Sequence, residues 1–493
     1  MKEKTCSSKT RAVLPVLLAL IAISAHAQLP GQPAASASPT PDQSTAQPAV
    51  FSVQQQSSGV FSGSAKIDQL QPGVIKLPIL DAINRGLQHN LGLLLSQEQT
   101  QAARAQYRRS LSNLLPNLTA RATDSVQQIN LAAFGIPLPA GLSSPVVGPF
   151  NVIDARAALS QTVLDFSAMN RLRQSSESER TARFTVQDAR ELVVLVVGNQ
   201  YLLTVAAASR LDTAKVQLTT AQTILRQTQD QRNAGVVAGI DVLRAQVEMQ
   251  TQQQRVLAAQ NQFEQQKMVL ARIIGMPAGQ QIELTDTVPY AQLPEINMEE
   301  SLARAYQHRP EYLAAESRVK ASELALKAAK DERLPSVQLN GDFGGLGQNP
   351  STIENTYSLA AGVRIPIFQG GRVKADVQQA ETDLRQSQFQ LQDLHNRVEL
   401  EVRSALLDVK TSNDQVNVAR QSIGLANEQL KQAQDRLSAG VAGTLEVVQA
   451  QDAVAISNET YIQALYQNNV AKLTLARALG VAEEQTKAFL GGK

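Results

Sequence analysis

The sequence contains little or none of several residue types, and each absence argues against a class of protein. Its single cysteine is Cys6, so no disulfide can form within the chain and the residues after it carry no thiol. Its four histidines have no cysteine or carboxylate cluster beside them, and no glycine-rich loop with a lysine opens a helix. We therefore predict no catalytic site, no cofactor, no bound metal and no enzymatic activity.

An excess of charge is also lacking, because the formal net charge is only +2 at pH 7. This balance gives no electrostatic reason to expect a nucleic acid as a partner. Near the start, basic residues precede the apolar run Ala12–Ser24, and a small-x-small site follows at 25–27. The run is too short to span a membrane, so the pattern predicts a secretory signal peptide over residues 1–27. Residues 28–65 are almost uncharged and rich in Pro, Ser and Gln, which predicts a disordered leader.

The rest of the sequence contains a duplication. Gln88-His89 recurs as Gln307-His308, and Leu115-Pro116 recurs as Leu334-Pro335, both 219 residues later. A repeat of this length is too long for a solenoid unit, whose period is about 20–50 residues. We predict a duplicated domain, with a first repeat at 66–290, a second repeat at 291–481 and a C-terminal tail at 482–493.

Proline and glycine are nearly absent from two long stretches. Ala168–Ala234 and Arg372–Ala439 each contain no proline and a single glycine. At 1.5 Å per residue, each stretch would form a helix of about 100 Å. Ordinary globular helices have about 11–12 residues, so these helices are typical of a coiled-coil-like assembly. Shorter helical stretches before and after them predict two stacked helices beside each long one.

After each Leu-Pro the hydrophobic period changes from about 3.6 to 2. Val337, Leu339 and Phe343, for example, alternate with polar residues. We predict β-hairpins at about 116–165 and about 335–368. Such amphipathic strands fit a barrel that crosses an outer membrane, and also a half-buried sheet of a soluble protein. Four strands leave two open edges, so a membrane barrel would need strands from several chains.

Several motifs in this order resemble the TolC family of outer-membrane efflux channels. They include the doubled hairpin-and-helix layout and the segment Ile367-Phe368-Gln369-Gly370-Gly371-Arg372 before the second long helix. Each repeat also has a Gly-Val turn and ends in Ala-Arg-x-x-Gly. The resemblance covers roughly residues 76–481.

The resemblance implies a mostly α fold with β-strands, located in the outer membrane. A long α-helical barrel forms a periplasmic tunnel and joins a 12-stranded transmembrane β-barrel that a homotrimer shares, four strands per protomer. The implied function is a passive duct of a tripartite efflux or type I secretion system. The implied partners are outer membrane lipid, a periplasmic adaptor (membrane fusion) protein and an inner-membrane pump of the RND or ABC type.

Some family features are missing. No mature N-terminal cysteine is available for a lipid anchor, and Ala442 stands where the best-known members have an arginine that locks the periplasmic aperture. With no tryptophan and only 4% aromatic residues, the candidates for interfacial anchors are Phe343, Tyr357 and Phe368.

The two Gly-Val turns are the candidate docking sites. They are Asn233-Ala234-Gly235-Val236 and Ser438-Ala439-Gly440-Val441. We expect both at the periplasmic tip, in contact with the adaptor, and a plain interhelical turn without a partner is the alternative. Glycine allows the backbone to reverse closely, and valine offers a small apolar knob.

Two acidic residues at equivalent repeat positions are the candidate gate. Asp241 and Glu446 each lie six residues after the turn glycine, at a helix start. Simple helix capping is one interpretation. In a trimer they would instead form a ring of about six carboxylates around the aperture, which would attract cations. Arg244 is expected to pair with Asp241 or with Glu446 of a neighbouring helix.

A non-channel periplasmic coiled-coil protein, either an adaptor or an envelope spacer, is the alternative. An adaptor would have one helical hairpin within small β domains rather than a duplicated array. A spacer would need no alternating strands.

Overall fold

The computed structural model describes residues 59–65, 67–135, 144–286, 293 and 297–489. The chain divides into two units, Met1–Ser52 and Val53–Lys493. The first unit, with the expected signal peptide and much of the expected leader, lies outside the described residues.

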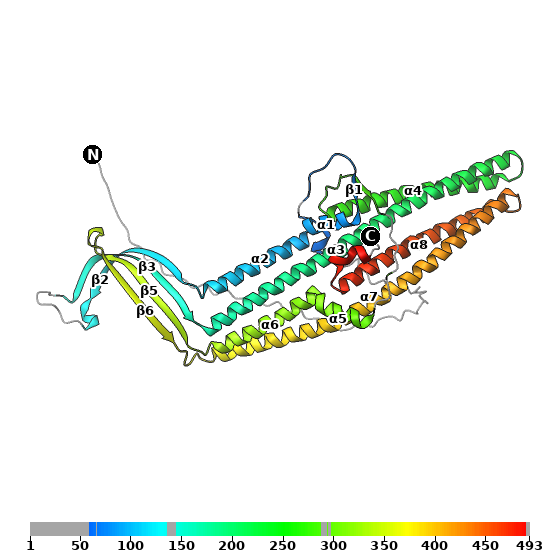
Figure 1. Cartoon of the computed structure of the whole chain (residues 1–493). Coiled ribbons are helices and arrows are strands. Elements are labelled where there is room, and N and C mark those ends of the chain that lie inside the picture. The colour runs from blue at the N-terminus through cyan, green and yellow to red at the C-terminus, as the bar shows by residue number, and fades with distance from the viewer. Residues whose placement is uncertain (1–58, 66, 136–143, 287–292, 294–296, 490–493) are drawn as a thin grey trace, which may run out of the picture. The chain divides into compact units, whose positions relative to one another are not determined.

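The second unit contains two copies of one series of elements, as Figure 1 shows. Each copy has two short helices, a β-hairpin, a long helix and a helix about half as long. Matching helices have 11 and 11, 22 and 22, 68 and 67, and 35 and 35 residues. The first copy consists of α1 (Ile79–His89), α2 (Leu91–Ser112), β2 (Asn117–Asn130), β3 (Val146–Leu164), α3 (Phe166–Asn233) and α4 (Gly239–Ile273). The second consists of α5 (Met298–His308), α6 (Pro310–Asp331), β5 (Ser336–Gly347), β6 (Glu354–Arg364), α7 (Arg372–Ser438) and α8 (Thr444–Ala478).

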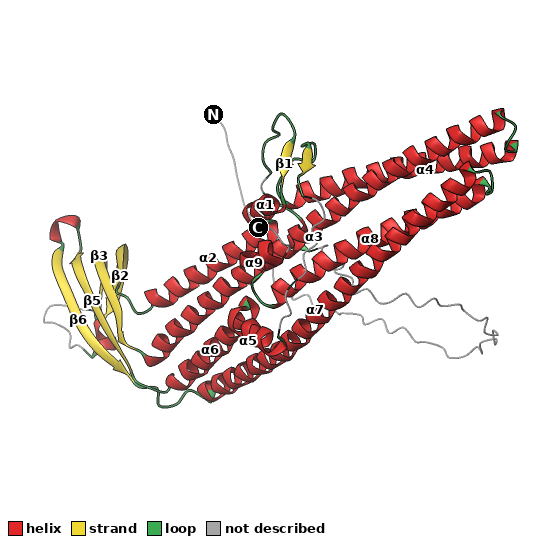
Figure 2. Cartoon of the chain, turned by 45° about the vertical axis from the view of Figure 1, so that its right-hand side comes forward, coloured by secondary structure: helices red, strands yellow, loops and turns green. Residues whose placement is uncertain are grey.

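The long helices α3 and α7 are flanked by the shorter ones (Figure 2). α2 and α4 pack along α3, while α6 and α8 pack along α7, and α3 also contacts α6. Buried apolar residues, most of them small, recur at steps of 3, 4 and 7 along α7: Val416, Ala419, Ala426, Ala433 and Leu437. Small side chains let the helix backbones approach closely, which explains why these arms need few large residues.

The short helices break once in each repeat. At the first break, the buried Asn90 side chain accepts a hydrogen bond from the Gly92 N–H (3.0 Å) and donates one to the Phe61 carbonyl (2.6 Å). At the second break, Pro310 begins α6 because its fixed φ and missing N–H suit the first helical position.

The largest hydrophobic cluster joins the two repeats near these breaks. It includes Val197 of α3, Val398 of α7 and Leu475 of α8, all fully buried. Two short parallel strands, β1 (Ile75–Leu77) and β4 (Ile282–Leu284), contribute to it. Among the described helices, only α3 has a stretch long and apolar enough to cross a membrane, and 61% of that stretch is buried within the protein. α3 is therefore a core helix.

Both ends of the described chain pack beyond the expected domain limits. Residues 59–65, the end of the expected leader, include the 3-10 turn η2 (Val60–Ser62), and Phe61 packs on the main cluster. After Val481, where a tail is expected, α9 (Ala482–Phe489) buries Phe489. The composition of such a segment does not show that one aromatic side chain packs against the core. The free energy gained by burying that side chain offsets the entropy lost when a short segment becomes ordered.

The four longer strands form one antiparallel sheet in the order β2-β3-β5-β6. Pairing of β3 with β5 joins the hairpins of the two repeats. The alternation in the sequence continues to Ile367, but β6 ends at Arg364. Pro366 cannot donate to a ladder, so strand pairing stops before it.

Candidate functional site

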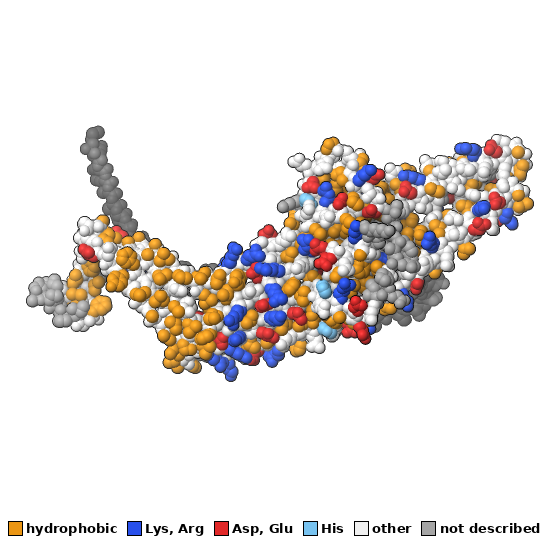
Figure 3. Space-filling view, in the orientation of Figure 1, with side chains coloured by type: hydrophobic (Ala, Val, Ile, Leu, Met, Phe, Trp, Pro, Cys, Tyr) orange, Lys and Arg blue, Asp and Glu red, His pale blue; other side chains and the backbone are white. Residues whose placement is uncertain are grey.

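One face of the sheet is apolar and exposed. The register aligns Leu118, Leu159, Gly341 and Leu359 in one row across all four strands. Every second residue from this row shares its face. Leu118 and Leu359 are each 72% exposed, and Figure 3 shows hydrophobic side chains gathered over the strands. An exposed apolar surface of this kind marks a membrane or protein contact.

The candidate aromatic anchors lie at both ends of this apolar face. Phe343 and Tyr357 are direct partners across β5 and β6, near the hairpin end, and both are exposed. Phe368 lies after β6, at the end of the sheet that adjoins the helices, and is also exposed. Aromatic residues at the two boundaries are typical of strands that cross a membrane.

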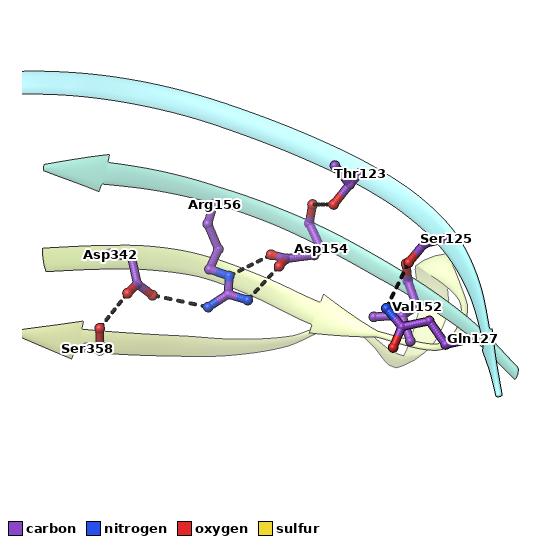
Figure 4. A network of polar contacts seen from close by, with 8 residues as sticks. All are labelled: Thr123, Ser125, Gln127, Val152, Asp154, Arg156, Asp342 and Ser358. Atoms are coloured by element: carbon purple, nitrogen blue, oxygen red, sulfur yellow. Dashed lines mark hydrogen bonds and ion pairs between the residues drawn. The ribbon is translucent and has the colours of Figure 1, made fainter. Parts of the chain in front are cut away.

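The opposite face is polar, and an ion network crosses it (Figure 4). Arg156 of β3 donates to Asp154 of the same strand (Nε to Oδ1, 2.6 Å) and to Asp342 of β5 (Nη1 to Oδ2, 3.3 Å). Ser358 of β6 donates to the other oxygen of Asp342. Thr123 of β2 donates to the backbone carbonyl of Asp154. This face suits a water-filled interior.

The sheet has two open edges. Within the described residues, β2 and β6 each pair with only one other strand. Their outer backbone groups would remain unsatisfied in hydrocarbon, so the membrane-facing sheet requires strands from elsewhere to complete it.

The two Gly-Val turns lie together at the end of the helices farthest from the sheet (Figures 1 and 2). A hydrogen bond from Gln231 Nε2 to the Leu437 carbonyl (3.5 Å) links the two helix ends. Ile224, Ala433, Leu437, Val447 and Ala450 form a small hydrophobic cluster near them. The structure thus brings together the two turns that the sequence places about 200 residues apart.

Both turns have the same backbone motif. α3 ends at Asn233 with Ala234 as its cap, and Gly235 has φ 75°. The Val236 N–H donates to the Gln231 carbonyl (2.9 Å). The second turn repeats this arrangement: α7 ends at Ser438, Ala439 is the cap, Gly440 has φ 71°, and the Val441 N–H donates to the Arg436 carbonyl (3.0 Å). This is a Schellman motif, in which glycine adopts the left-handed conformation at no steric cost.

The turn valines project as exposed apolar residues. Val236 is 62% exposed and Val441 is 69% exposed. Ile240 and Leu445, at the start of the following helices, are exposed as well. The tip therefore presents a small apolar surface with nothing packed on it in the described chain.

The candidate gate residues lie at this tip, in separate ion pairs. Asp241 is in the first turn of α4, and Arg244 Nη1 is 3.4 Å from its Oδ1. Glu446 is in the first turn of α8, and Arg436 Nε is 3.1 Å from its Oε1. Arg244 thus pairs with Asp241 and not with Glu446. The sequence pattern did not predict Arg436. It lies in the last helical turn of α7, and the hairpin at Gly440 brings this end of α7 next to the start of α8.

These features match a known protein family. Residues 82–276 and 302–481, one segment in each repeat, match the family described as outer membrane efflux protein. The chain belongs to this family.

Its relatives include outer membrane efflux proteins of several bacteria. The outer membrane protein OprJ of Pseudomonas aeruginosa is 26% identical over 430 residues, which cover 83% of this chain and 85% of OprJ. The cation efflux system protein CusC of Escherichia coli K12 is 22% identical over 410 residues, covering 81% of this chain and 85% of CusC. Among solved structures, the CmeC outer membrane channel of Campylobacter jejuni has a TM-score of 0.70 at 17% identity, covering 86% of this chain and 92% of CmeC.

As an outer membrane efflux protein, the chain is an outer membrane channel component with a helical periplasmic tunnel and a β-barrel part. The TolC-type fold inferred from the sequence is confirmed. The family supports the channel interpretation and not the adaptor or spacer alternative, and its fold is that of channel proteins.

Proposed function

We propose that the protein is a passive export duct, formed by three chains, that carries cargo across the periplasm and the outer membrane. The observation that carries this proposal is the amphipathic four-stranded sheet with two open edges, continuous with helices of about 100 Å. Three such sheets, joined edge to edge, give a closed 12-stranded barrel with the Arg156 network inside and Leu118 and Leu359 outside. The duct itself carries out no catalysis.

A row of exposed apolar residues on α7 supports contact with a neighbouring chain. Its members are separated by 11, 7, 11 and 7 residues, an average of 3.6 per turn, so they form a straight stripe along the helix. Their exposed fractions range from 63% to 74%: Phe389, Leu400, Leu407, Val418 and Leu425. A stripe of this length on a helix in water needs a partner, and in a trimer the next protomer covers it.

The tip turns are proposed to dock a periplasmic adaptor, which links the duct to an inner-membrane pump of the RND or ABC type. Val236 and Val441 offer the apolar contact, and Gly235 and Gly440 keep the turn tight enough for close approach. CusC is named as a cation efflux protein and the Pseudomonas putida relative OpmQ as a pyoverdine export protein. The cargo class differs among these relatives, so we assign the duct and not a cargo.

Asp241 and Glu446 are proposed to line the aperture, six carboxylates in the trimer. Each has an arginine beside it, so the ring has fixed negative sites and a reduced net charge. Both pairs lie within one chain, Arg244 with Asp241 on α4 and Arg436 with Glu446 across one turn. Partly exposed pairs of this kind contribute only about 0–1 kcal/mol.

Complementation of a strain that lacks the protein tests the duct and the docking site together. The wild-type chain should restore resistance to a panel of drugs and metal salts, and its purified trimers should conduct ions in planar bilayers. Gly440→Leu should abolish export because the left-handed turn is strained by a side chain, while trimers and conductance persist. Wild-type protein that is monomeric and non-conducting would contradict the duct. Export by Gly440→Leu at the wild-type level would contradict docking at this turn.

A further inference from the structure

Basic residues gather where the helices adjoin the sheet. Four segments meet there: 105–116 at the end of α2, 165–176 at the start of α3, 326–335 at the end of α6 and 365–376 at the start of α7. Together they hold nine Lys or Arg and four Asp or Glu, an excess of five positive charges, whereas the whole chain has a formal net charge of only +2. The excess is therefore local to this level of the molecule.

The four carboxylates at this level already have partners. Asp165 accepts from the Ala168 N–H at the start of α3 (2.9 Å), and Asp331 accepts from Asn170. Glu332 pairs with Arg171 and Arg372, and Asp376 pairs with Arg372 (2.8 Å). Within the described residues, six exposed cations here have no carboxylate partner: Arg108, Arg109, Arg173, Lys327, Arg333 and Lys374. We call Arg108, Arg173, Arg333 and Lys374, one from each segment, the basic collar.

An exposed apolar rim separates the collar from the strands. Leu115 and Leu334 are 49% and 43% exposed, and Phe368 is 87% exposed. Arg173 lies seven residues after Phe166 on α3, which is about 10 Å along the helix, and Arg108 lies in the last two turns of α2, seven residues before Leu115. Figure 3 shows Lys and Arg side chains over the helices beside the sheet, on the same side of the molecule as its apolar face.

We propose that the basic collar binds the phosphate groups of anionic phospholipids in the periplasmic leaflet of the outer membrane. The apolar sheet face lies in the hydrocarbon, so the rim lies at its periplasmic boundary and the collar at the level of the headgroups. Lys and Arg stems pack along apolar surface while their charged ends reach the polar layer. Because the carboxylates of the four segments already accept hydrogen bonds or ion pairs from other groups, the collar cations remain available to pair with lipid phosphates.

Lipid analysis of reconstituted trimers tests this proposal, which rests on the membrane position of the sheet. Wild-type protein is reconstituted in mixed phosphatidylethanolamine and phosphatidylglycerol, extracted in mild detergent, and its co-purified lipid is measured by mass spectrometry. Phosphatidylglycerol should be enriched over the bulk mixture by at least about twofold, and the enrichment should fall with added salt. The variant Arg108→Gln, Arg173→Gln, Arg333→Gln, Lys374→Gln should lose most of this enrichment.

A matched variant controls for loss of charge alone. Arg226→Gln, Lys410→Gln, Arg420→Gln, Lys431→Gln removes four exposed cations from the distant parts of α3 and α7 and should keep the enrichment. If the full variant fails to assemble, two half-variants replace it. One combines Arg108→Gln with Arg173→Gln, and the other combines Arg333→Gln with Lys374→Gln. A collar variant that forms conducting trimers but keeps the wild-type enrichment overturns the proposal. Failure of the wild-type protein to conduct would instead contradict the duct.

Discussion

At the scale of single residues, charge pairs determine the chemistry of the helix tips. Asp241 and Glu446 lie in first helical turns, where the helix dipole favours a carboxylate, and each has an arginine within 3.4 Å. The sequence pattern predicts both carboxylates at helix starts and Arg244 as an ion-pair partner. It did not reveal Arg436, because pairing across a turn depends on how two helices face one another.

Removal of both carboxylates should change ion selectivity at the aperture. We expect the double variant Asp241→Ala, Glu446→Ala to lose cation preference and to be blocked less by trivalent cations, because Arg244 and Arg436 then lack their anions. Single-channel recording in asymmetric salt measures both effects. The control variant Glu299→Gln, Glu300→Gln removes two carboxylates from the first turn of α5 and should leave them unchanged. If the tip variant behaves like this control, the carboxylates serve only the helix starts.

At the scale of elements, the period of the apolar residues and the positions of proline and glycine predict most helices and strands. The long helices, the hairpins and the turns follow from scarce proline, alternating apolar residues and Gly-Val pairs. α9 could not be predicted, because eight residues after a turn carry too little pattern. Its docking depends on Glu191 of α3, whose carboxylate accepts from the N–H groups of Ala482 (2.6 Å) and Glu483 (3.2 Å).

Docking of α9 should weaken as the pH rises toward neutrality. Burial raises the pKa of Glu191 from 4.5 to about 7, and the two N–H donors offset this only in part. With α9 docked, Glu191 therefore retains a proton that it releases between about pH 4.5 and 7 when α9 is undocked, so the stability of the docked state falls as the pH rises through this window. The pKa of nearby Asp188 is also raised by burial and acts in the same sense.

Hydrogen exchange of α9 at several pH values, corrected for the intrinsic rate, measures this effect. Protection should fall between about pH 4.5 and 7 in the wild type and should vary less in Glu191→Gln. Glu484→Gln, an exposed change on α9 itself, should retain the wild-type pH dependence. Equal slopes in the wild type and Glu191→Gln would show that Glu191 does not control this docking.

At the scale of the whole molecule, the duplication gives each chain four strands, which is one third of the proposed 12-stranded barrel. The repeat predicts two hairpins, and the structure joins them through β3 and β5 into one sheet with free edges at β2 and β6. Local sequence pattern could not predict that pairing, because contacts between distant strands depend on how the two helical halves pack. Other copies of the chain are proposed to complete these edges.

Disulfide cross-linking between the edge strands measures this most directly, since the only natural cysteine is Cys6. Thr123→Cys on β2 is combined in turn with Ser358→Cys, Ala360→Cys or Gly362→Cys on β6, all on the polar face. Across one open sheet, three strand spacings alone separate β2 from β6 by about 14 Å, and the register places the three β6 positions four to eight residues farther along the strand. These distances exceed the 4.4–6.8 Å that a disulfide bridges between Cα atoms. Oxidation of membranes should convert at least one pair into a covalent trimer on a denaturing gel. If every pair yields only internally linked monomers or a covalent tetramer, the shared three-chain barrel is wrong.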